Sequence, residues 1–427
     1  MEDAMAYADG VGALGWLLVS ASLVLLMTPA LAFFYGGMSR SKSVLNMMMM
    51  SFGALGVGML AWVLFGYSIS AGPTVNNLFG EPFSNFGMID VVNNYADDPI
   101  TLISAGFGAT FAIITVALIS GSVADRMKFS AWLTFAFIWV ILVYAPVSHW
   151  VWGTGTNGEG FDALLGGGGP LFGDLPGPYD FAGGTVVHIN AGVAGLVLAL
   201  LLGIRKGFGK EPFKPHNLPF VMLGAALLWF GWFGFNAGSA FAADGYAALA
   251  WVNTTTATAV AMLGWLLAEK LRDGKATSLG AASGVVAGLV AITPSCASVD
   301  TWGAIIIGFF AGVLSALAVG LKYKLGYDDS LDVVGVHLVS GLWGTLAIGL
   351  VASGTVNGDA GLFYGGGVTL LGVQAAAAAI VIVYSAIMTL LIGLAIKYTI
   401  GLRVSEDVEV QGIDLAEHGE TAYEEAV

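Results

Sequence analysis

Two histidines lie inside long apolar segments of this sequence, where a charged side chain would have no water around it. His188 belongs to the segment DFAGGTVVHINAGVAG, which covers residues 180–195. His337 belongs to the segment DSLDVVGVHLVSGLWG, which covers residues 329–344. In each segment an aspartate stands eight residues before the histidine, and glycines follow the histidine at positions +4 and +7. Ionisable residues placed this deep usually mark a transport pathway, a proton relay or a ligand site.

Three kinds of chemistry fit such a pair. A buried imidazole can hydrogen-bond a neighbouring backbone or hydroxyl group, which is the simplest role for a single buried histidine. Two facing histidines can ligate a haem iron from both sides, as in a membrane electron-transfer protein. Two neutral imidazoles can instead line a narrow pore, because each ring offers one donor and one acceptor. Since desolvation disfavours the imidazolium, we expect a neutral pair or a pair that shares one proton.

Aromatic and hydroxyl side chains in other apolar segments are compatible with a cation site. Phe111 lies in ATFAIIT, Trp152 lies in HWVWG, and WFGWFGFNAGSA contains Trp232, Phe235 and Ser239. Each aromatic face attracts a desolvated cation by about 0.5–2 kcal/mol. A tryptophan and a phenylalanine at an outer mouth, with a hydroxyl nearby, therefore suit a small cation. A belt of aromatic residues at the membrane interface is the alternative interpretation, and it would account for many of the 12 tryptophans.

Membrane-spanning helices must position these residues. Of the 427 residues, 57% are hydrophobic and only 10% are charged, whereas roughly a quarter are charged in soluble domains. Apolar runs of about 20 residues cross the hydrocarbon core, where only helices or closed barrels satisfy the backbone. We therefore predict an all-α polytopic membrane protein with eleven transmembrane helices. The expected spans are 12–35, 44–69, 100–120, 130–149, 184–203, 218–239, 247–268, 278–296, 302–321, 333–352 and 370–397.

The basic residues predict the orientation of these spans. All 15 Lys and Arg residues follow odd-numbered spans and therefore lie on one side of the membrane. The positive-inside rule assigns that side to the cytoplasm, so we expect the N-terminus outside and the C-terminus in the cytoplasm. The opposite side carries acids and no base, which either keeps the exterior solvated or raises the local concentration of cations.

The two histidine segments predict an inverted repeat. They belong to the fifth and tenth expected spans, which run in opposite directions because their positions in the order differ by five, an odd number. Such repeats place the transport site near the middle of the bilayer, between the two halves. We expect a transmembrane domain at 1–400, with halves at about 12–205 and 218–352 and an eleventh helix at 370–397. A cytoplasmic tail is expected at 401–427.

Some classes of feature are not expected. The single cysteine, Cys296, excludes an internal disulfide. No basic, cleavable leader precedes the first span, so we expect no signal peptide. We predict no metal site, no cofactor and no nucleic-acid partner. The outer loops at 70–99 and 150–183 are long, and the glycines and prolines of the second loop indicate an irregular cover.

Four longer motifs resemble the ammonium transporter family (Amt/Mep/Rh), in its bacterial or archaeal Amt branch. They cover residues 180–205, 232–240, 332–344 and 401–423, and the similarity extends over about 400 residues. The resemblance implies a transporter rather than an enzyme, in the inner (cytoplasmic) membrane. It also implies a homotrimer of eleven-helix subunits, each with its own pore.

The resemblance further implies roles for the aromatic residues. Trp152, Phe111 and Ser239 resemble the external site of the family that recruits ammonium. Phe111 and Phe235 resemble the paired phenyl rings that close the pore below that site. Gly108 stands one turn before Phe111, where some relatives carry a polar side chain, so the recruitment site is expected to be less polar here.

The pore residues follow from the same resemblance. His188 and His337 resemble the twin-histidine motif and are expected to relay a proton. Asp180 resembles the acid near the recruitment site, and we interpret it as mainly structural, because the helix dipole favours a carboxylate at a helix N-terminus. Trp232 is expected to support the site.

The implied mechanism begins when ammonium exchanges part of its water for the aromatic and hydroxyl groups. Because desolvation favours ammonia over the charged ion, the proton leaves and ammonia passes the phenyl rings. We expect net transfer of one charge per ammonium. An ammonium sensor of the same fold is the alternative, and a bis-histidine haem protein is a third. Sensors in this family tend to carry an added signalling domain, which favours transport.

Two peripheral segments carry further expectations. The motif at 401–423 resembles the segment through which family members are blocked by a trimeric PII-type signalling protein, and a solvated acidic tail is the alternative. The part of the second outer loop at 156–179 is longer than in many relatives, and the sequence indicates no role for it.

Overall fold

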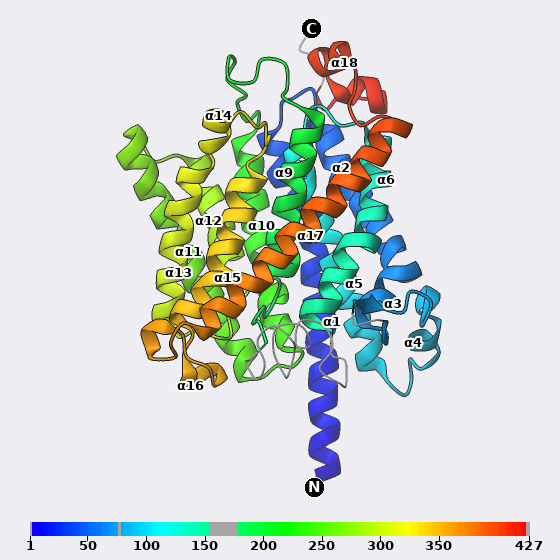
Figure 1. Cartoon of the computed structure of the whole chain (residues 1–427), viewed down its shortest axis with the longest axis vertical. Helices are drawn as coiled ribbons and strands as arrows, with labels where there is room; N and C mark the ends of the chain where they lie inside the picture. The colour runs from blue at the N-terminus through cyan, green and yellow to red at the C-terminus, as the bar shows by residue number, and fades with distance from the viewer. Residues whose placement is uncertain (1, 76–77, 154–176, 424–427) are drawn as a thin grey trace.

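The chain forms a bundle of long helices, which the computed structural model describes over residues 2–75, 78–153 and 177–423 (Figure 1). The N-terminal end of the first helix and the end of the tail lie at opposite ends of this bundle (Figure 1). Most of the long outer-loop segment at 156–179 lies outside the described residues, so the structure does not test its role.

The first half of the chain supplies the elements that carry Phe111, Trp152 and His188. Its helical elements are α1 (Glu2–Met38), α2 (Val44–Ala61), η1 (Trp62–Gly66), α3 (Tyr67–Ala71), α5 (Pro99–Ile119), η3 (Ser120–Val123), α6 (Phe129–Trp139), η4 (Val140–Tyr144), α7 (Ala145–Trp152), η5 (Gly184–Ile189) and α9 (Asn190–Leu202). The connection between α3 and α5 contains β1 (Thr74–Val75), β2 (Phe79–Gly80), η2 (Phe86–Met88) and α4 (Ile89–Asn93). The two short strands pair antiparallel, with Thr74 opposite Gly80.

The second half supplies Trp232, Phe235, Ser239 and His337. Its helical elements are α10 (Leu218–Asn236), η6 (Ala237–Ala240), α11 (Gly245–Asp273), α12 (Ser278–Ile292), α13 (Thr301–Ala318), α14 (Leu321–Leu325), η7 (Val334–Leu338), α15 (Val339–Val351), α16 (Gly354–Asn357), η8 (Leu362–Tyr364) and α17 (Thr369–Thr399). The tail adds α18 (Glu406–Gln411) and η9 (Asp414–His418). Helix α17 runs obliquely across the bundle, and α18 lies at the end opposite the N-terminus (Figure 1).

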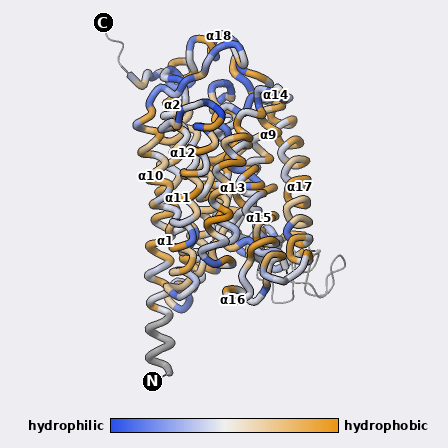
Figure 2. The backbone as a smooth tube through the Cα atoms, turned by 90° about the vertical axis from the view of Figure 1, so that its left-hand side faces the viewer, coloured by the Kyte–Doolittle hydropathy of each residue, from blue (hydrophilic) through white to orange (hydrophobic). Residues whose placement is uncertain are grey.

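Within the described residues, nine helices are long and apolar enough to cross a membrane. The expected seventh and eighth spans are not among them. Helix α11 is long but polar, with the run NTTTATA, whereas α12 is apolar but has only 15 residues. The all-helical membrane class is therefore confirmed, while the count of eleven and the orientation stay predictions. Figure 2 shows the hydrophilic positions gathered mainly towards the ends of the bundle, most densely around α18.

The eighth expected span ends earlier than the sequence indicates. We expected it to reach residue 296, but α12 ends at Ile292. Pro294 cannot donate the next helical hydrogen bond. The chain instead turns inside the bundle, where Thr293, Ser295 and Cys296 are 0% exposed. This buried turn lies next to the functional site described below.

Close helix packing depends on small residues. A methyl group at Gly308 would lie 2.3 Å from the carbonyl oxygen of Ala257, and one at Gly312 would lie 2.0 Å from that of Ala261. Glycine at these two positions therefore lets α13 approach the backbone of α11, as is usual for helices packed in membranes.

Candidate functional site

The two histidines face each other inside the bundle. The Nδ1 atoms of His188 and His337 are 3.3 Å apart, within hydrogen-bond distance. Their rings are stacked, with centroids 5.4 Å apart and planes 19° apart. A hydrogen bond between two Nδ1 atoms requires one ring to donate and the other to accept, so the protonation of one ring is coupled to that of the other. The Nε2 atom of His188 has no hydrogen-bond partner among the described residues.

The spacing of the repeat explains how the rings meet. The glycines at +4 lie where the two helices cross. A methyl group at Gly192 would lie 2.6 Å from Cβ of Leu338, and one at Gly341 would lie 3.0 Å from Cβ of His188. Each half thus places a glycine against the histidine region of the other half. Because the first turns, η5 and η7, are wider π-helical turns, both histidines lie in the same local structure.

The aspartates of the repeat hold the starts of these turns. The carboxylate of Asp180 accepts hydrogen bonds from four backbone N–H groups, those of Gly183, Gly184, Thr185 and Val186. Asp329 accepts one from the N–H of Val334 at 2.7 Å and one from the hydroxyl of Ser122 at 2.8 Å. These bonds satisfy donors that a helix start leaves without partners. The contacts of Asp180 are those of a helix cap.

A small apolar cavity, of about 10 Å³, lies beside the histidine pair. It is lined by Met27, Leu31, Ile114, Leu118, Val187, His188, Leu228, Trp232, Phe235, Val286 and His337. Such a volume admits about one small molecule, since one water needs roughly 10–15 Å³. A haem would place its iron and macrocycle between the two rings, but the Nδ1 atoms are within hydrogen-bond distance. The pair therefore does not fit a haem, and that alternative is discarded.

Two stacked phenyl rings separate this small cavity from a larger one. The ring centroids of Phe111 and Phe235 are 4.1 Å apart, with an angle of 18° between the ring planes. Both side chains are buried, at 3% and 0% exposure. Phe235 lines the small cavity and Phe111 lines the large one, so the stacked pair lies between them.

The larger cavity, of about 480 Å³, contains the predicted recruitment residues. It is lined by Trp62, Tyr67, Ser70, Ala71, Thr101, Ser104, Ala105, Phe107, Gly108, Phe111, Tyr144, Ser148, Trp152, Phe181, Ser239 and Phe241. The indole N–H of Trp152 donates to the carbonyl of Asp180 at 2.7 Å, so its ring face is what remains for a ligand. The Ser239 hydroxyl donates to the carbonyl of Phe235 at 2.8 Å, which leaves its oxygen free to accept from an N–H donor.

Several cavity residues were not predicted from the sequence. Phe107 is one turn before Phe111 on α5, and helical spacing could have found it, because residues four apart share a face. Trp62 and Tyr144 come from distant segments, and no local signal points to them. A methyl group at Gly108 would lie 2.9 Å from the Trp62 ring. An indole therefore occupies the space that a side chain at 108 would need.

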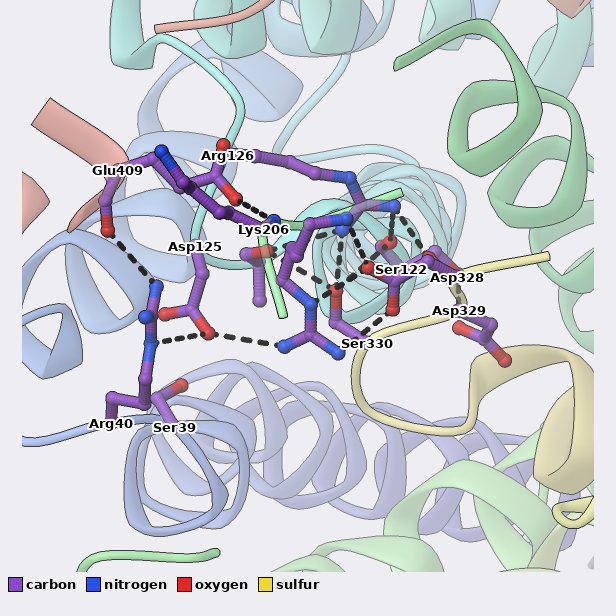
Figure 3. A network of polar contacts seen from close by, with 12 residues as sticks. Ser39, Arg40, Ser122, Asp125, Arg126, Lys206, Asp328, Asp329, Ser330 and Glu409 are labelled. Atoms are coloured by element: carbon purple, nitrogen blue, oxygen red, sulfur yellow. Dashed lines mark hydrogen bonds and ion pairs between the residues drawn. The ribbon is translucent and has the colours of Figure 1, made fainter. Parts of the chain in front are cut away.

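A buried ionic network lies at the tail end of the bundle, and its Arg40 donates to the backbone carbonyl of Glu409 (Figure 3). The guanidinium of Arg205 pairs with Asp328 at 2.8 Å and with Asp125 at 3.1 Å. The Arg40 guanidinium pairs with the same carboxylate of Asp125 at 3.2 Å. Arg126, which is 0% exposed, donates to backbone carbonyls and to the hydroxyl of Ser330. The network joins the segments that follow α1, η3 and α9.

The tail is packed onto this end of the bundle. Glu409 is 1% exposed and accepts from the Arg403 guanidinium at 2.6 Å and from the backbone N–H of Lys206 at 2.7 Å. Asp414 accepts from the backbone N–H groups of Leu45 and Asn46 at the start of α2, at 3.0 and 2.8 Å. Two acids of the tail are therefore packed against the bundle, whereas Glu406, Asp407, Glu417 and Glu420 are exposed.

The network predicts a pH dependence of stability. Burial raises the pKa of Asp328, but the hydrogen bonds and charge of Arg205 outweigh burial, so the pKa lies below its usual range. A carboxyl with a lowered pKa stabilises the fold above its unfolded pKa of about 3.9, and this contribution is lost as the pH falls through the folded value. We expect Asp328→Asn to cost about 3–5 kcal/mol at pH 7, and progressively less below about pH 4.

Thermal unfolding of the detergent-solubilised protein between pH 3 and pH 7 measures this effect. The matched control is Asp273→Asn, which removes a pair with Arg272 whose two side chains are 40% and 48% exposed. Exposed pairs contribute little to stability, so this control should shift the unfolding midpoint only slightly. Equal shifts for the two variants at pH 7 would contradict the prediction.

The fold and this site define a helical membrane protein with a buried histidine pair beside two internal cavities, and comparisons with known proteins name its family. The sequence model of the Ammonium Transporter Family matches residues 15–423. An ammonium transporter of Mycobacterium tuberculosis is 58% identical over 447 aligned residues, which cover 99% of this chain and 92% of the relative. An ammonium transporter of Aquifex aeolicus is 49% identical, covering 96% of this chain and 93% of the relative. The chain therefore belongs to the ammonium transporter family, whose members are membrane transporters and not enzymes.

Solved structures agree with this family. A structure described as a sensor Amt protein superposes with a TM-score of 0.86 at 27% identity, covering 98% of this chain and 100% of that chain. The crystal structure of Mep2 from Candida albicans superposes with a TM-score of 0.84 at 32% identity, covering 96% and 90%. The expected family is thereby confirmed.

Proposed function

We propose that this protein transports ammonium by binding the ion in the larger cavity and passing ammonia along the histidine pair. Trp152, Phe111 and Ser239 would bind the ion, with two aromatic faces and one hydroxyl oxygen as acceptor. These contacts return only a few kcal/mol, which is less than the cost of moving a bare ion into an apolar passage. The proton therefore leaves, and neutral ammonia passes Phe111 and Phe235.

The observation that carries this proposal is the histidine pair at the end of the pathway. Its two Nδ1 atoms are 3.3 Å apart, and one Nε2 atom lacks a partner within the described residues. Such a pair can accept a proton on one ring and release one from the other. We propose that the proton follows this route, so that one charge crosses with each ammonium.

The proposal extends to the orientation, the assembly and a partner protein. The basic residues support eleven spans with the N-terminus outside and the C-terminus in the cytoplasm. Family membership supports a homotrimer in the inner (cytoplasmic) membrane. The packed tail at 401–423 supports a PII-type signalling protein as a partner. A protein that bound the tail and displaced Glu409 would break its hydrogen bonds to Lys206 and Arg403.

A second candidate function is ammonium sensing. The observation in its favour is the superposition on the sensor Amt protein, with a TM-score of 0.86 over 98% of this chain. A sensor needs the recruitment cavity but no conducting histidine pair. Measured flux therefore separates the two functions.

Proteoliposomes given ammonium pulses on a solid-supported membrane test the proposal. We expect a transient current that saturates with ammonium concentration, while equal pulses of sodium chloride give none. Internal pH recorded in the same vesicles adds a second measurement. Ammonia uptake without current would overturn the charge-transfer step alone. The absence of both current and uptake would overturn transport and would favour sensing.

A further inference from the structure

Trp232 lies between the closing rings and the histidine pair. Its indole stacks on the His188 ring, with centroids 5.4 Å apart and planes 16° apart. It also contacts the Phe235 ring, with centroids 5.2 Å apart. Whatever fixes the plane of this indole therefore also determines the surface against which His188 rests.

The indole is held by the hydroxyl of Thr293, in the buried turn after α12. The Nε1–H group of Trp232 donates to Oγ1 of Thr293 at 2.8 Å. The hydroxyl hydrogen of Thr293 can go to the Leu289 carbonyl at 2.7 Å or to Oδ1 of Asn236 at 3.3 Å. In either case the oxygen of Thr293 remains an acceptor for the indole.

The same chain of hydrogen bonds continues away from the pathway. The side-chain amide of Asn236 donates to Oγ1 of Thr254, in α11, at 2.8 Å. Asn236, Thr254 and Thr293 are all 0% exposed. A buried network with its partners satisfied rigidifies the core around it. The indole of Trp232 is thus tied to α11 and to the end of α12.

His188 has few other restraints on its ring. Its Nδ1 bonds only to His337, and its Nε2 has no partner among the residues that the structure describes. The ring also contacts Phe235, with centroids 6.1 Å apart, but those planes are tilted by 34°, so the stacked surface for the imidazole on this side is the face of Trp232. We propose that Thr293 is a positioning residue for transport, because its hydroxyl holds Trp232 in the plane that keeps His188 stacked on His337. This inference rests on the proposed function.

Thr293→Val tests it, since valine keeps the shape of threonine and lacks the hydroxyl. We expect the maximal ammonium-driven current to fall roughly tenfold, the factor that one lost buried hydrogen bond can produce. The half-saturating concentration should stay unchanged, because the recruitment cavity is untouched. Thr293→Ser, which restores the hydroxyl, should recover most of the current. All currents are compared per amount of folded protein.

The chain offers a matched control in Thr389. Its Oγ1 accepts the indole N–H of Trp139 at 3.0 Å, and both side chains are 0% exposed. Thr389→Val therefore removes the same kind of buried bond away from the histidines, and its current should match the wild type. If both valine variants lose the same thermal stability but only Thr293→Val loses current, the loss of stability cannot explain the loss of current.

Trp232→Phe probes the same bond from the other side. Phenylalanine keeps a ring but has no N–H, so adding Thr293→Val to it should lower the current no further. Three results would overturn the inference. They are a Thr293→Val current equal to that of the wild type, a Thr293→Ser current as low as that of the valine variant, and additive losses of current in the double variant. Wild-type vesicles without any ammonium signal would instead overturn the proposed function.

Discussion

Replacing both His188 and His337 by alanine is expected to abolish the ammonium-driven current of the reconstituted protein. The two imidazoles are the ionisable groups that line the small cavity, and their Nδ1 atoms are 3.3 Å apart. Alanine leaves an apolar passage with no group that accepts a proton. Ammonia can still diffuse through such a passage, so uptake of ammonia should persist while charge movement stops.

The measurement is the current per folded protein on a solid-supported membrane, together with the internal pH of the vesicles. His216→Ala is the control, since this histidine lies outside the pathway and bonds the carbonyl of Ser39 at 2.9 Å. Each single alanine variant should lower the current, because one ring cannot relay a proton alone. Undiminished current in the double variant would refute the relay.

Replacing Asp180 by alanine is expected to produce the largest loss of stability among the site residues. The substitution leaves four buried backbone N–H groups without their acceptor. Each unsatisfied donor costs about 1–3 kcal/mol, and a whole domain is stable by only about 5–15 kcal/mol. We therefore expect little correctly folded Asp180→Ala protein, and no current from it.

Asp244→Ala provides the comparison for that variant. Asp244 caps α11 through a single backbone N–H, that of Ala247, at 3.0 Å, and its side chain lies on the surface. Losing such an exposed cap costs about 1 kcal/mol. Size-exclusion profiles and thermal midpoints in detergent measure both effects. Similar midpoints for the two variants would show that the four bonds of Asp180 contribute little.

The histidine pair was predictable because its signal is local and repeated. An acid, a histidine and two glycines recur at the same spacing in two segments. The acids accept hydrogen bonds at the starts of the two turns, and the glycines at +4 lie where the helices cross. The aromatic residues Trp152 and Phe111 and the hydroxyl of Ser239 were predicted by resemblance, and all three residues line one cavity.

Other parts of the site depend on contacts between distant residues. The bond from Trp232 to Thr293 joins positions 61 residues apart, and neither residue is unusual in its own segment. Trp62 reaches the cavity only because position 108 carries no side chain. The packing of the tail could not be predicted either, because Glu409 and Asp414 look like solvated acids until their backbone donors are known. The early end of α12 follows from Pro294, a signal that the apolar run conceals.

The hydrogen bond between the two imidazoles would give the proposed proton route a direction that has to be restored after each transfer. At any moment one Nδ1 carries the hydrogen and the other offers a lone pair. If a proton enters one ring and another leaves its neighbour, donor and acceptor exchange roles, and the next proton meets a pair of opposite polarity. Turnover would then require a return step, in which both imidazoles go back to their starting tautomers before the next ammonium ion can lose its proton. The maximal rate would be limited by that return even when ammonium is abundant.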